Sequence, residues 1–131
     1  MLHPEYMARI MADKHNGIVV VGLPGRGKVH TLRQFLPEAK YFAYGNRAKA
    51  TALFDFISEH STRPIIIDDI QNEMSPENIH ICVAAMDGDM SCHINNVYRA
   101  ISYHGKLIFP VFKTIHLHHS ILSRSLIVDF G

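Results

Sequence analysis

The chain has 131 residues, 47% of them hydrophobic, and a formal net charge of +1 at pH 7. This length suits a single domain over residues 1–131 with a core of its own, and the near-neutral net charge argues neither for nor against a polyanionic partner. Two cysteines are too few for a disulfide framework and fit a reducing compartment, so we expect a cytoplasmic protein with no membrane span.

In chain order, the sequence predicts helices that alternate with apolar strands. Residues 4–14 place apolar side chains at helical spacing, and "IVVV" at 18–21 is a β-branched run typical of a strand buried on both faces. The two patterns recur to the end of the chain. The predicted helices cover 4–14, 28–36, 46–60, 75–88 and 117–123, and the predicted strands cover 18–21, 40–44, 64–68, 106–112 and 125–130.

Local signals place several ends of these elements. Asn46 and Ser75 are predicted N-caps, Pro76 suits the first helical position, and Gly88 ends that helix. Residues 89–105 carry no clear pattern and are compatible with a hairpin. The alternation predicts an α/β fold, with a parallel sheet and helices on both faces. In such sheets ligands bind at the carboxyl ends of the strands.

A glycine-rich stretch, "GLPGRGKVHT" at 22–31, follows the first predicted strand directly. Gly22, Gly27 and Lys28 fit the phosphate-binding pattern G-x-x-x-x-G-K-[ST], in which backbone N–H groups and the lysine hold phosphates. Val29 replaces the final hydroxyl residue. The predicted nucleotide-binding residues are Gly22, Leu23, Pro24, Gly25, Arg26, Gly27, Lys28, Val29 and His30.

Two adjacent acids end the third predicted strand, in "RPIIIDDI" at 63–70. A buried strand followed by an aspartate, downstream of a phosphate loop, is typical of a Walker B element. We expect Asp68 to hold Mg²⁺ and Asp69 to position the attacking water. The surrounding residues 64–89 hold six acids and no Lys or Arg, a pattern typical either of a metal-facing surface or of an ordinary solvated one.

The chain as a whole resembles the core of an AAA+ P-loop ATPase. "GLPGRGK" is similar to that superfamily's "GxPGxGK", and "PIIIDDI" to its Walker B strand, in a form with two aspartates. "GKLIFPVF" lies where the sensor-one strand belongs, and "HHSILSRSLIVDF" resembles the segment that leads into the last core strand. The stretch "YGNRAKATALFDFISEHSTRPIIIDD" is most similar to small ATP-binding proteins of plasmids, phages and bacterial genomes.

This resemblance implies a P-loop NTPase three-layer sandwich with a five-stranded parallel sheet ordered 5-1-4-3-2. It also implies ATP and Mg²⁺ as ligands, a homo-oligomer, and work in DNA replication or mobile-element maintenance, with DNA or a DNA-bound protein as a partner. On the same analogy Arg124 takes the arginine-finger position and acts on the γ-phosphate held by a neighbouring subunit. The alternative is a surface arginine that caps the short helix.

The sequence also departs from the family pattern. Val29 offers no oxygen to magnesium, no asparagine follows the strand at 106–112, and we expect the helical lid domain to be absent. Weak ATP hydrolysis is therefore the first hypothesis. One alternative is a superfamily-three viral helicase core, which would act in the host cytoplasm or nucleus. The other is a hydrolysis-deficient, nucleotide-binding assembly module.

Two further groups of residues have simpler explanations. His80, Cys82, Cys92 and His93 match no standard zinc spacing, so we expect surface histidines and buried thiols. Tyr41, Phe42 and Tyr44 can stack on nucleic-acid bases. We expect them to pack in the core instead.

Overall fold

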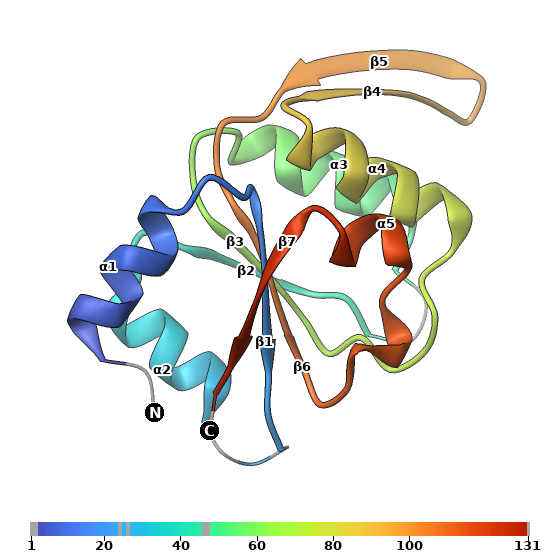
Figure 1. The fold of residues 1–131 in the computed structure, drawn as a ribbon. Coiled ribbons are helices and arrows are strands. Elements are labelled where there is room, and N and C mark those ends of the chain that lie inside the picture. Colours follow the sequence, from blue (N-terminus) through green and yellow to red (C-terminus); the bar gives the residue numbers. More distant parts are fainter. Residues whose placement is uncertain (1–2, 24, 26, 46–47, 131) are drawn as a thin grey trace.

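A parallel sheet of five strands forms the centre of the molecule, and a separate antiparallel hairpin lies beyond two of its helices (Figure 1). The structure, a computed structural model, describes residues 3–23, 25, 27–45 and 48–130. The sheet order is β2-β3-β6-β1-β7, and every neighbouring pair is parallel. Its strands are β1 (Gly17–Val21), β2 (Lys40–Ala43), β3 (Ile65–Asp68), β6 (Leu107–Val111) and β7 (Ser125–Asp129).

Helices cover both faces of this sheet, as the buried apolar strands predicted. The helices are α1 (Pro4–Ala12), α2 (Lys28–Phe35), α3 (Ala50–Glu59), α4 (Pro76–Met86) and α5 (His119–Leu122), with a 3₁₀ turn at Thr114–His116. Alternate residues of β3 enter different cores, because strand side chains point to opposite faces. Ile66 packs with the side chains of α1 and α2, whereas Ile65 and Ile67 pack with those of α3, α4 and α5.

The predicted ends of the elements are confirmed at α4 and wrong at α3. The Ser75 side chain accepts a hydrogen bond from Asn78 N at 3.2 Å, and Pro76 is the first helical residue. The helix predicted over 46–60 begins only at Ala50, because Lys49 is extended with φ −78° and ψ 143°. The predicted cap, Asn46, lies outside the described residues.

The hairpin consists of β4 (Asp89–Ile94) and β5 (Val97–Ser102). Asn95 and Asn96 join the strands with φ of 53° and 64°. Left-handed conformations at both central residues are typical of a tight two-residue hairpin turn, and Asn tolerates them better than most residues. Among the described residues, no helix is long and apolar enough to cross a membrane.

Candidate functional site

The predicted phosphate loop connects the end of β1 to the start of α2. Gly22 continues from β1 and donates its N–H to the Val111 carbonyl at 3.1 Å. Gly25 and Gly27 have φ of 78° and 73°, in the left-handed region that favours glycine. An added Cβ at either position would meet nothing within 4 Å, so it is the backbone conformation that calls for glycine there. Pro24 and Arg26 lie outside the described residues.

Lys28 is the first residue of α2, and its side chain folds back over the loop. Its Nζ donates hydrogen bonds to the carbonyls of Gly22 at 2.7 Å and Leu23 at 2.9 Å. Partial burial lowers the pKa of Lys28, and the nearby charge of Asp68 opposes that shift. The ammonium therefore lies beside both the loop backbone and an acid of β3.

A pocket of about 380 Å³ brings the two predicted motifs together. It lies at the carboxyl ends of β1, β3 and β6, the edge at which ligands bind in parallel sheets. Its lining comprises Gly25, Gly27, Lys28, Val29, His30, Asp68, Asp69, Ile70, Pro110, Val111 and Phe112. Thus the described part of the glycine loop and both acids face one cavity. Gly22 and Leu23 do not line it, but their carbonyls accept hydrogen bonds from Lys28, which does.

Pro110 lines this pocket at the point where the pairing of β3 and β6 ends. The ladder between β3 and β6 ends at the pair Ile66 and Ile108. The Val111 carbonyl accepts from Gly22 on the β1 side. Since backbone groups alternate along a strand, the nitrogen of Pro110 faces β3, where it has no hydrogen to donate. Pro110 therefore cannot donate a ladder hydrogen bond to β3 beyond the pair Ile66 and Ile108.

The two acids differ in their surroundings. Asp68 ends β3, is half-buried, and accepts a hydrogen bond from the Tyr41 hydroxyl at 2.7 Å. Asp69 is exposed and has φ 64°, an uncommon conformation outside glycine that aspartate tolerates. The Gln71 amide approaches both carboxylate oxygens of Asp69, at 3.3 and 3.2 Å. The turn after β3 thus directs Asp69 to the same cavity as Asp68.

The carboxylates of Asp68 and Asp69 fit a nucleotide-bound magnesium ion better than a metal ion held by the protein alone. Among the described residues, no group of three or more His, Cys, Asp or Glu side chains could hold a metal. Magnesium commonly binds to one or two carboxylates and completes its shell with substrate phosphates and water. Asp68 and Asp69, facing the loop across the pocket, suit that arrangement.

Arg124 lies at the amino-terminal end of the strands, whereas the loop lies at their carboxyl end. Ser125 pairs with Gly17 and Asp129 with Val21, so Arg124 precedes the start of β7, about 13 Å of strand away from the loop end of β1. Its Nε donates to Asp87 at 2.9 Å and its Nη1 to the Ser120 carbonyl at 3.1 Å. Arg124 does cap α5, as the alternative proposed, and it cannot serve the loop of its own chain. An action on a neighbouring subunit stays a prediction.

Tyr41 and its hydrogen bond were missed by the sequence prediction. Tyr44 is buried and Phe42 packs on Phe56, but Tyr41 is 37% exposed, so the expectation of a core residue was wrong for Tyr41. Gln71, Pro110 and Phe112 were not predicted as parts of the site either. No local sequence signal identifies Tyr41, because its contact depends on β2 and β3 being neighbours.

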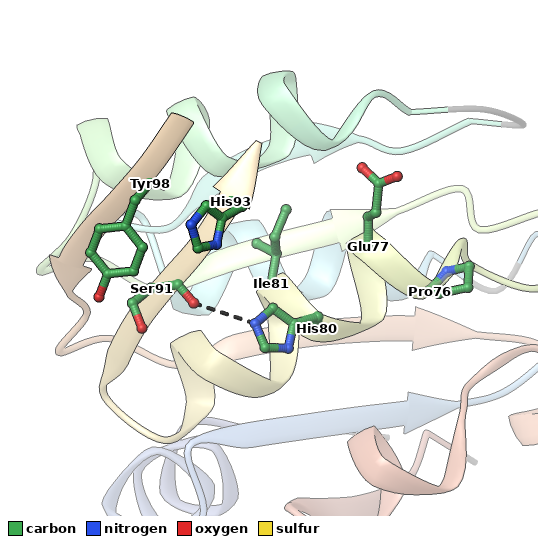
Figure 2. A pocket seen from close by; sticks show the side chains of 7 residues that line it. All are labelled: Pro76, Glu77, His80, Ile81, Ser91, His93 and Tyr98. Carbon is green, nitrogen blue, oxygen red and sulfur yellow. Dashed lines mark hydrogen bonds between the residues drawn. The ribbon is translucent and has the colours of Figure 1, made fainter. Parts of the chain in front are cut away.

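A second pocket of about 380 Å³ lies between α4 and the hairpin (Figure 2). His80 Nε2 is 3.3 Å from the Ser91 carbonyl oxygen, and the ring centroids of His93 and Tyr98 are 5.2 Å apart. The Cys82 side chain, in contrast, is fully buried in the core. His80 and Cys82 therefore face different environments. The side chain of Cys92 lies outside the described residues.

No protein-family model matches the chain, and a search of curated proteins finds no significant relative.

Proposed function

We propose that the chain is an ATP-binding domain of the AAA+ P-loop type, with weak ATP hydrolysis. The observation that carries the proposal is the shared pocket, in which a glycine loop, Lys28 and the acids Asp68 and Asp69 converge at the carboxyl edge of the sheet. The order β7-β1-β6-β3-β2 supports a P-loop NTPase fold, because it corresponds to 5-1-4-3-2 when these five strands are numbered along the chain.

Each residue has a role that its position suits. The loop N–H groups and the N-terminus of α2 would bind phosphate oxygens. Lys28 would exchange its bonds to the Gly22 and Leu23 carbonyls for bonds to phosphate. Asp68 would hold magnesium, which supplies charge neutralisation on the phosphates when bound, and Asp69 would orient the attacking water. A role in DNA replication or mobile-element maintenance, within a homo-oligomer, follows from the sequence resemblance.

A second candidate is a nucleotide-binding assembly module that does not hydrolyse ATP. Two residues that line the pocket favour this second candidate. Val29 has no hydroxyl oxygen for magnesium, and Phe112 has no side-chain amide at the end of β6. The two candidates share nucleotide binding and differ in turnover.

Calorimetric titration with ATP, with and without Mg²⁺, tests the shared part of the proposal. Lys28→Ala should weaken ATP binding by about 1.5–3 kcal/mol, the usual contribution of a hydrogen bond to a charged group. Lys14→Ala is the matched control, because it removes an exposed lysine that precedes β1, at the end of the strand opposite the loop. Equal affinities for the wild type and Lys28→Ala would disprove the phosphate-loop interpretation.

A further inference from the structure

Tyr41 on β2 contacts the acid expected to hold magnesium, although it belongs to neither nucleotide-binding motif. Its hydroxyl donates to Oδ2 of Asp68 at 2.7 Å. The register pairs Ala43 with Asp68, so Tyr41 lies two residues before that pair on the neighbouring strand. Residues two apart share one face of a strand, and a tyrosine is long enough to span this diagonal.

The ring of Tyr41 is itself held in place. The guanidinium of Arg33, in the last turn of α2, lies 5.4 Å from the ring centroid. A cation over an aromatic face at that distance is attracted to the ring. The contacts run from Arg33 through Tyr41 to Asp68, and they connect the helix that follows the phosphate loop to the end of β3.

This hydroxyl faces the same acid that a hydroxyl at position 29 would approach. In the phosphate-loop pattern, the Ser or Thr after the lysine places its oxygen on magnesium beside the Walker B aspartate. Val29 and Asp68 line one pocket here, but valine has no oxygen. A carboxylate has two oxygens. The bond to Tyr41 uses Oδ2, which leaves Oδ1 for the cavity that Asp68 lines.

We propose that Tyr41 is a positioning residue, whose hydroxyl fixes the Asp68 carboxylate so that the pocket can accept magnesium-bound nucleotide without a hydroxyl at position 29. This inference rests on the proposed nucleotide-binding function. In this proposal Tyr41 holds the carboxylate of Asp68 in the orientation that magnesium needs. Base stacking and core packing do not account for its contact with Asp68.

Tyr41→Phe tests the proposal, because it removes only the hydroxyl and keeps the ring beneath Arg33. We expect the gain in ATP affinity produced by Mg²⁺ to fall about three- to tenfold in calorimetry, which is less than a buried bond to a charged group contributes, because the contact is exposed. ATP affinity in EDTA should be unchanged. Tyr98→Phe, on the hairpin, is the matched control and should behave as the wild type.

A rescue variant separates positioning from general packing. In the Tyr41→Phe background, Val29→Thr should restore at least part of the magnesium effect, since it returns a hydroxyl to the same pocket. An unchanged or larger magnesium effect in Tyr41→Phe would overturn the proposal, as would equal losses with and without Mg²⁺. If the wild type itself binds no ATP, the proposed function fails and this inference with it. If the wild type binds and Tyr41→Phe matches it, only the role of Tyr41 fails.

Discussion

The ammonium of Lys28 lies 2.7 Å from the carbonyl oxygen of Gly22, so the side chain closes the loop whose two ends these residues mark. The closure depends on a tight backbone path. Gly27 precedes the lysine with φ 73°, and its carbonyl accepts the first helical bond, from Thr31 N at 2.9 Å. The conformation at Gly27 therefore connects the loop to the helix that would face the phosphates.

Replacing Gly27 should weaken ATP binding through the backbone alone. Gly27→Ala adds a Cβ that meets no neighbouring atom within 4 Å, but holding alanine in the left-handed region costs about 1–2 kcal/mol. We expect about a tenfold loss of ATP affinity in calorimetry. Gly27→Asn should lose less, because asparagine visits this conformation more readily. Equal losses for both variants would show that bulk at this position matters more than backbone conformation.

Restoring a hydroxyl at position 29 should improve the use of magnesium. Val29→Thr keeps nearly the same shape but adds an oxygen in the pocket that holds Asp68. We expect higher ATP affinity in the presence of Mg²⁺, or faster turnover, and no change in EDTA. Val83→Thr, on α4 and away from the lining of this pocket, is a control for the substitution itself. An identical magnesium dependence before and after Val29→Thr would contradict the view that Val29 limits metal handling.

The thiol of Cys82 should be inert in the folded protein. Cys82 is completely buried, and burial raises its pKa to about 12. In a Cys92→Ser variant, where Cys82 is the remaining cysteine, iodoacetamide should react at pH 8 only as fast as the chain unfolds, since the thiolate is the reactive form.

The same shift predicts how stability depends on pH. A raised folded-state pKa favours the protonated thiol, so its contribution to the free energy of unfolding is complete below about pH 9 and is lost as the pH rises toward 12. The stability difference between Cys92→Ser and Cys92→Ser/Cys82→Ala, measured by urea unfolding, should therefore shrink across that range. A constant difference would contradict the burial of a neutral thiol.

The sequence was most informative where hydrophobic burial decides the structure. Runs such as "IVVV" and "PIII" are apolar at successive positions, and only a strand covered on both faces satisfies all of them. This is why the parallel sheet with helices on both faces could be predicted. The cap at Ser75 was predictable for a different reason, because its hydrogen bond spans only three residues.

Features that depend on neighbouring strands or on single backbone angles were not predictable in this way. The bond from Tyr41 to Asp68 joins residues 27 apart in the sequence. The missing ladder bond at Pro110 depends on which neighbouring strand its nitrogen faces. The pair Asn95 and Asn96 was a turn signal that the prediction did not use, and it would have located the hairpin.

The last prediction asks whether the chain hydrolyses ATP. Asp69 contributes to turnover only if water attacks the bound nucleotide. Arg124 contributes only across a subunit interface, because Arg124 lies at the amino-terminal end of the strands, away from the loop of its own chain. We therefore expect weak ATPase activity that rises with protein concentration. Asp69→Asn should abolish turnover and spare ATP binding, since it removes a base and keeps the volume.

Arg124→Ala needs a control for its own contacts, because Arg124 pairs with Asp87 at 2.9 Å. Asp87→Ala breaks the same ion pair but leaves the arginine, and both variants should lose at most about 1 kcal/mol of stability, as exposed pairs do. Only Arg124→Ala should abolish turnover. Mixing it with Asp69→Asn should recover some activity, because each variant supplies at alternate interfaces the group that the other lacks. Turnover that survives in Arg124→Ala would disprove the finger role. A wild type that binds ATP without turnover at any concentration would leave the assembly module as the function.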